Sequence, residues 1–120
     1  MRTLFLLFAA AMIAPAAHIE VQGHRGARSV RPENTMSAFN YAIQAGADVL
    51  ELDIRVTKDG VVVVSHDGDV KPPVCSGPEP KADIRQLTLK QVKQWDCGSV
   101  RNPAFPRQEL SPGERIPTLD

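Results

Sequence analysis

The sequence has little of several features that define common protein classes. Its 120 residues include two cysteines, and these lack the close Cys-x-x-Cys spacing of a metal or redox site. Lysine and arginine number 14, as many as aspartate and glutamate together. A nucleic-acid-binding or membrane-surface protein would carry an excess of positive charge. The composition therefore argues against both partners and favours a structural role for the cysteines.

Long apolar runs are scarce as well. The run at residues 4–14 is shorter than the roughly 20 residues that span a bilayer. Arg2 precedes it and the small-residue pattern Ala14-Pro15-Ala16 follows it, which is typical of a secretory signal peptide. We expect residues 1–16 to be removed and residues 17–120 to be exported, to the periplasm or the cell exterior, without a transmembrane segment.

This destination bears on the two cysteines. In an oxidising compartment Cys75 and Cys97 can close a disulfide. Such a bridge would add roughly 3 kcal/mol of stability by restricting the unfolded chain. The alternative is a pair of unrelated thiols.

A helix is predicted after residue 35. Met36, Phe39 and Ile43 recur at helical spacing on one face. Asn34 or Thr35 can cap its start, and Gly46 stands where a left-handed residue commonly ends a helix.

Strands are predicted on both sides of this helix. Residues 19–22 are a short strand that leads into a turn with two glycines, and residues 47–56 alternate between apolar and charged side chains. Two strands joined by a helix run parallel with a right-handed crossover. The next apolar run, residues 61–65, follows the two-residue hairpin signal Asp59-Gly60. We expect it to fold back antiparallel and to return His66 toward the preceding strand.

Residues 70–116 differ in character. Together with Pro117 they contain eight of the ten prolines and show little periodicity, which is typical of an insertion on a scaffold. Within them Thr88 and Gln91 have the spacing of a capping box, so we expect a short helix at residues 89–95.

Two acids interrupt the apolar strand at residues 47–56. Glu51 and Asp53 are two residues apart, so their side chains share one face. Carboxylates that converge in a confined space repel each other unless a proton or a cation compensates. Oxygen ligands alone suit Ca²⁺ or Mg²⁺ better than zinc. The alternative is a solvated acidic face on an edge strand.

Other reactive side chains stand at the ends of the predicted strands. His24 and His66 can both reach the carboxylates there and act as a general acid and a general base. Arg25 has the planar group that binds phosphate well, although it could instead pair with an acid at the surface. Together with a cation, these residues suit hydrolysis of a phosphate ester.

The order of the motifs points to a known family. The chain contains GHRGARSVRPENTMSAF, GADVLELDIRVTKDGVVVVSHD and IPTLD. These stretches resemble the motifs HRG, PENT, GAD, ELD, TKDG, HD and IPTL of the glycerophosphodiester phosphodiesterases, densely over residues 21–67 and again at the C-terminal end. The resemblance implies a TIM (β/α)8 barrel that uses Ca²⁺ or Mg²⁺ to cleave glycerophosphodiesters into glycerol 3-phosphate and an alcohol.

The resemblance also implies roles for single residues. By matching position, the acid/base pair is His24 and His66, the phosphate-binding residue is Arg25, and the metal ligands are Glu51 and Asp53. Glu33 and Asn34 are interpreted as shaping the start of the first helix, and Asp67 as supporting His66 or its turn. The family's third acidic ligand follows the IPTL motif on a later strand, so we expect it beyond Asp120.

The length leaves alternatives open. A TIM barrel needs about 250 residues, so residues 17–120 are interpreted as the N-terminal part of one, with the acids pointing into its mouth. A different phosphodiesterase on a similar barrel, such as a phosphatidylinositol-specific phospholipase C or a phospholipase D of the sphingomyelinase type, is one alternative. A non-catalytic binding module or an unfolded gene fragment is another. The released alcohol and the oligomeric state are left open.

Overall fold

The computed structural model describes residues 18–119. The predicted signal peptide at residues 1–16 and the chain end at Asp120 lie outside the described residues. No helix in the described part is long and apolar enough to cross a membrane.

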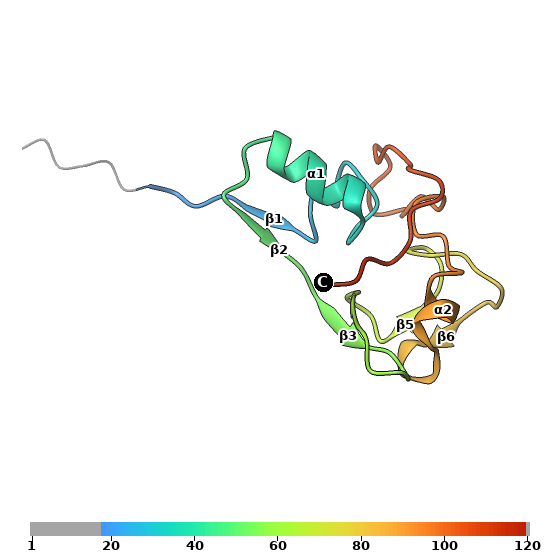
Figure 1. The fold of residues 1–120 in the computed structure, drawn as a ribbon. Helices are drawn as coiled ribbons and strands as arrows, with labels where there is room; N and C mark the ends of the chain where they lie inside the picture. The colour runs from blue at the N-terminus through green and yellow to red at the C-terminus, as the bar shows by residue number, and fades with distance from the viewer. Residues whose placement is uncertain (1–17, 120) are drawn as a thin grey trace, which may run out of the picture.

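The first structural unit is a strand, a helix and a strand. Strand β1 (Gln22–His24) pairs in parallel with β2 (Val49–Glu51), and helix α1 (Met36–Gln44) packs against both (Figure 1). The predicted parallel unit is therefore confirmed, although β1 is displaced toward the C-terminus of the predicted strand at residues 19–22.

Helix α1 begins and ends as its capping residues predict, but of the predicted apolar face only Phe39 is buried. The Thr35 hydroxyl accepts a hydrogen bond from the backbone N–H of Ala38, and Gly46 has a φ of +87° just after the helix. Met36 and Ile43, predicted to face the core, are more than half exposed. The buried residues are Ala38, Phe39 and Ala42. Alanines let the helix approach the β1 backbone closely, a contact that hydrophobic spacing does not indicate.

The strand predicted at residues 47–56 is broken in two. After β2 the chain passes through Leu52 and Asp53 into β3 (Ile54–Val56), which pairs antiparallel with β4 (Val62–Val64). The prediction of one strand was wrong because the chain changes partners at this point, from β1 to β4. The predicted antiparallel hairpin is confirmed.

The hairpin turn is longer than predicted. The backbone N–H of Thr57 donates to the carbonyl oxygen of Val61, so three residues rather than two connect the paired strands. Gly60 takes the left-handed conformation that such a turn requires, with a φ of +82°.

Residues 70–116 contain only short elements. Strand β5 (Asp69–Val70) pairs antiparallel with β6 (Ala82–Asp83), which leads into the 3₁₀ helix η1 (Ile84–Gln86). Helix α2 (Leu89–Val92) follows, with the predicted capping box but fewer residues than expected. The segment takes part in ordered packing despite its many prolines. Whether it is an insertion on a larger barrel stays a prediction.

The larger core of the described residues lies mainly within this segment. Cys75 and Cys97 are joined by a disulfide there. The core consists of Val63, Val70, Cys75, Ile84, Val92, Trp95, Cys97 and Ile116.

Hydrogen bonds of Gln108 and Glu114 help to join residues 70–116 to the first unit. The buried side chain of Gln108 donates to the carbonyl oxygens of Arg28 and Arg31. A carboxylate oxygen of Glu114 accepts from the backbone N–H of Ser37 at the start of α1. These bonds hold the segment against the loop before α1, where the candidate site lies.

Candidate active site

The candidate site is built on the ends of two parallel strands. His24 ends β1 and Glu51 ends β2, and the two residues are partners in the register. Nε2 of His24 lies 3.7 Å from Oε2 of Glu51. Both side chains are partly exposed, so this edge of the sheet is accessible to a small molecule.

A tight turn follows His24. Arg25 has a φ of +52° and Gly26 a φ of +79°, so two successive residues take the left-handed conformation. A Cβ atom on Gly26 would lie within 2.9 Å of Ala38 and Phe39 in α1. Only glycine fits this contact, which holds the turn against the helix.

Arg25 lies among three carboxylates. Its backbone N–H donates to Oε2 of Glu51 at 3.1 Å, and its Nη1 donates to Oε1 of Glu33 at 2.9 Å. Its Nε lies 3.5 Å from Oδ2 of Asp53. The side chain is only 14% exposed. The alternative to phosphate binding was that Arg25 pairs with an acid. In the structure Arg25 does pair with acids, and these are Glu33 and Asp53 of the candidate site.

Glu51 and Asp53 do meet near Arg25, although they are not on one continuous strand. Oδ2 of Asp53 is buried and has no hydrogen-bond partner within residues 18–119. Carboxylate oxygens, one of them lacking a donor, fit a hard divalent cation. Among the described residues no group of three acids, histidines or cysteines is placed to hold a metal. These two acids therefore offer part of a coordination shell.

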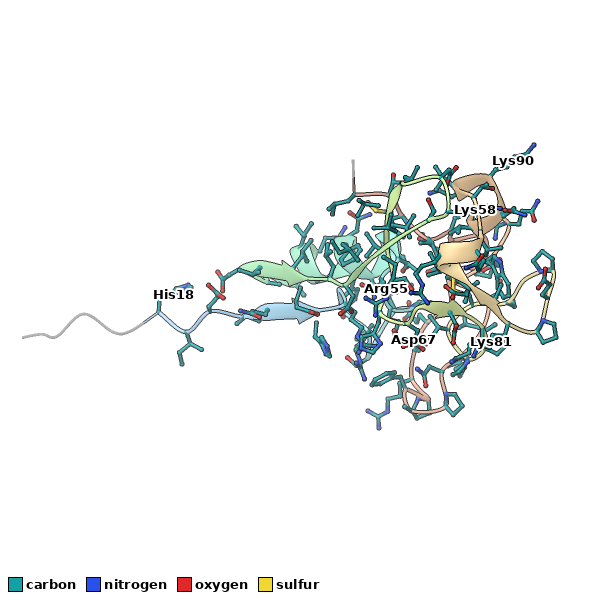
Figure 2. The ribbon with its side chains drawn as sticks, turned by 90° about the horizontal axis from the view of Figure 1, so that it is seen from below. His18, Arg55, Lys58, Asp67, Lys81 and Lys90 are labelled. Atoms are coloured by element: carbon teal, nitrogen blue, oxygen red, sulfur yellow. A yellow bond between two sulfur atoms is a disulfide. The ribbon has the colours of Figure 1, made fainter. Side chains whose placement is uncertain are left out.

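His66 is brought next to these acids by the hairpin. The backbone N–H of Ser65 donates to the carbonyl oxygen of Asp53 at 2.9 Å. Nδ1 of His66 lies 2.7 Å from Oδ1 of Asp67, and its carbonyl oxygen accepts from the Arg55 guanidinium. Figure 2 labels Arg55 and Asp67 near each other, to the right of the paired strands β1 and β2. The Asp67 contact is the one expected of a residue that supports His66.

A pocket adjoins His66. Glu33, the partner of Arg25, lies on its wall, so the pocket borders the candidate site. Its other lining residues are of two kinds. The polar ones are Asn34, Ser65, His66, Asp67 and Asp69, and the apolar ones are Val64, Val70, Val74, Cys75, Cys97 and Ile116. His24, Glu51 and Asp53 are not part of this lining.

Asp69, which lines the pocket, is paired with two lysines. The Lys81 ammonium donates to Asp69 and, with help from Lys71, holds the pKa of that carboxyl below its ordinary value. Asp69 therefore remains an ionised, paired carboxylate near neutral pH.

Asn34 and Thr35 were the two predicted caps of α1. Thr35, not Asn34, caps α1. The Asn34 side chain is 6% exposed, and neither its Nδ2 nor its Oδ1 has a hydrogen-bond partner within the described part of the chain. Its φ of +55° is compatible with asparagine. Its sequence position suggested a cap, and only the packing shows that the amide is buried at a pocket.

Known proteins resemble this chain over most of its length. The Glycerophosphoryl diester phosphodiesterase family matches residues 24–120. A glycerophosphodiester phosphodiesterase of Caldanaerobacter subterraneus is 40% identical over 99 residues, which cover 82% of this chain and 37% of that protein. The chain thus spans little more than a third of the length of the curated relatives that it matches.

Solved structures agree with this match. A glycerophosphodiester phosphodiesterase from Agrobacterium tumefaciens is 31% identical with a TM-score of 0.71, covering 86% of this chain and 40% of that one. A phosphodiesterase from Oleispira antarctica, in complex with the product sn-glycerol-3-phosphate, is 31% identical with a TM-score of 0.68, covering 84% and 37%. Enzymes of this family fold as TIM barrels, and the described residues include one parallel strand-helix-strand unit. The chain belongs to the glycerophosphoryl diester phosphodiesterase family.

Proposed function

We propose that this protein hydrolyses glycerophosphodiesters to glycerol 3-phosphate and an alcohol. The observation that carries the proposal is the convergence of His24, Arg25, Glu51 and Asp53 at adjoining strand ends. All four lie within the residues that match the family. The product bound to the Oleispira antarctica relative supports glycerol 3-phosphate as the product here.

The two histidines suit proton transfer in this reaction. One neutral imidazole takes a proton from the attacking nucleophile, and the other, protonated, gives a proton to the departing alcohol oxygen. Asp67 contacts Nδ1 of His66, so Nε2 is the nitrogen left to face the substrate. His24 is more than half exposed, and its Nε2 lies 3.7 Å from Oε2 of Glu51.

The carboxylates suit a divalent cation. Glu51 and Asp53 would supply oxygen ligands. Oδ2 of Asp53 accepts no hydrogen bond within residues 18–119, which is consistent with this role. A bound Ca²⁺ or Mg²⁺ would stabilise negative charge on the phosphate oxygens. Arg25 is held beside both acids and adds a fixed positive charge at the same edge. A third acidic ligand is expected beyond Asp120.

Export is part of the proposal. The apolar leader at residues 4–14 and the small residues after it support removal of residues 1–16. The disulfide between Cys75 and Cys97 is consistent with an oxidising compartment. We infer a periplasmic or extracellular location.

Hydrolysis of glycerophosphocholine, with and without a chelator, tests the function. His24→Ala and His66→Ala should each lower kcat by about 100-fold or more. His18→Ala is the matched control, because His18 is largely exposed and pairs with Asp48, which precedes β2 and so lies at the opposite end of that strand from Glu51. Full activity in His24→Ala would contradict the proposed mechanism. A preference for phosphatidylinositol or sphingomyelin would favour the phospholipase alternatives, and no turnover of any diester would favour a binding module.

A further inference from the structure

An unpaired amide at the pocket suggests a ligand contact. Asn34 is 6% exposed, and both polar atoms of its side chain lack a hydrogen-bond partner within residues 18–119. Buried amide groups in folded proteins are nearly always paired, because desolvation without a partner is costly. Asn34 lines the pocket next to His66. A molecule in this pocket can therefore supply the missing partners.

The other charged groups of the pocket already have partners. Glu33 accepts from Arg25 at 2.9 Å. Asp67 contacts His66 at 2.7 Å, and Asp69 pairs with Lys81 at 2.9 Å. Because Glu33, Asp67 and Asp69 already have positively charged or hydrogen-bonding partners, they do not require a cationic ligand. Their negative charges also disfavour a phosphate group in this pocket. The Nδ2 and Oδ1 atoms of Asn34, which can donate and accept, remain without a hydrogen-bond partner within residues 18–119.

This combination matches an alcohol hydroxyl. A hydroxyl both donates and accepts, so it can bond Oδ1 and Nδ2 of the same amide. Apolar residues such as Val64, Val70 and Ile116 also line the pocket and can contact a short carbon chain. We propose that Asn34 binds a hydroxyl group of the glycerol moiety and thereby sets specificity for glycerol-containing diesters. This inference rests on the proposed function.

The backbone at Asn34 allows a clean test. Its φ of +55° lies in the left-handed region, which glycine adopts without cost. The backbone N–H of Asn34 donates to the carbonyl oxygen of Arg25, a bond that glycine keeps. Asn34→Gly therefore removes the amide and preserves the turn.

The experiment compares substrates within each variant. The values of kcat/KM are measured for glycerophosphocholine and for two analogues that each lack one glycerol hydroxyl, using the whole protein. The wild type should lose about tenfold or more with one analogue, because the buried amide is then left unpaired. Asn34→Gly should show no such discrimination. The ratio is internal to each variant, so partial unfolding does not imitate the result.

A binding measurement separates the two proposals. Calorimetry with glycerol 3-phosphate should show about tenfold weaker binding to Asn34→Gly. Loss of binding in this variant without any turnover by the wild type would support the Asn34 contact and overturn the proposed hydrolysis. Turnover with equal discrimination in both proteins would overturn the Asn34 assignment and leave water as the partner of the amide.

Discussion

Nη1 of Arg25 donates a 2.9 Å hydrogen bond to Oε1 of Glu33, and both side chains are largely buried. The bond joins the turn after β1 to the segment before α1. Because Arg25 also lies beside Asp53, this one side chain connects the candidate metal ligands to the wall of the pocket.

Glu33→Gln should lower the free energy of unfolding by about 1–3 kcal/mol, because a largely buried arginine loses a charged acceptor. Urea denaturation measures the change. Glu109→Gln is the matched control: Glu109 pairs with Arg31 at 2.7 Å but is 67% exposed. Glu109→Gln should lower the free energy of unfolding by less than about 1 kcal/mol. Equal costs for the two variants would show that burial of the Arg25 pair is unimportant.

Gly26→Ala should be more destabilising than Gly60→Ala. Both glycines have a left-handed φ, +79° and +82°, so each substitution costs about 1–2 kcal/mol from the backbone. A Cβ at Gly26 also meets Ala38 and Phe39, whereas nothing lies within 4 Å at Gly60. This crowding should destabilise Gly26→Ala by about a further 1–3 kcal/mol. Thermal unfolding of both variants would test this, and equal melting temperatures would contradict it.

Asp96 should make stability depend on pH below about 4. Burial acts to raise the pKa of Asp96, but hydrogen bonds from the backbone N–H groups of Gly98 and Gly113 and from Ser99 outweigh it and lower the pKa below 3.8. A lowered folded-state pKa means that the stabilisation is complete above the unfolded-state pKa and is lost as pH falls through the folded one.

Asp96→Asn should therefore be less stable than the wild type at pH 5, and its free energy of unfolding should fall less steeply between pH 5 and pH 2. Urea denaturation over this range measures both. Some slope should remain, because the Lys81 hydrogen bond also lowers the pKa of Asp69. An unchanged slope in Asp96→Asn would rule out this residue as a source of acid sensitivity.

Loss of the disulfide should cost about 3 kcal/mol, since the bridge closes a loop between residues separated by 22 positions. The double variant Cys75→Ser/Cys97→Ser is compared with the wild type in urea, in the presence and absence of a reductant. Reductant should destabilise the wild type and leave the double variant unchanged. Insensitivity of the wild type would mean that the bridge contributes little.

Asp67→Asn should lower kcat with little effect on KM, because the Asp67 carboxylate contacts Nδ1 of His66 and orients the ring. The loss should be smaller than that of His66→Ala, since the imidazole itself remains. Steady-state kinetics on glycerophosphocholine provides the comparison. A change in KM alone would assign Asp67 to substrate binding instead.

Several features of the fold could be predicted because they depend on nearby residues. Alternating apolar residues and the Asp59-Gly60 turn predicted the β3–β4 hairpin, and Thr35 and Gly46 marked the ends of α1. The capping box of Thr88 and Gln91 likewise predicted α2. Each pattern concerns residues within a turn or two of one another.

The break after β2 could not be predicted, because residues 47–56 alternate without interruption. It arises where β1 turns away at His24 and β4 becomes the partner of the next residues. The two buried alanines of α1, Ala38 and Ala42, were missed for a related reason. The helix approaches Gly23 through Ala42, and small size rather than hydrophobicity allows that contact.

The sequence by itself determined the parallel strand-helix-strand unit, the hairpin and the family, because these follow from local periodicity and from motifs in a fixed order. Only the tertiary structure decided that Arg25 lies between Glu33 and Asp53, and that the Asn34 amide is buried without a partner at a pocket. Such contacts join segments that no local pattern relates, and they depend on how the turn after β1 packs against α1 and residues 70–116.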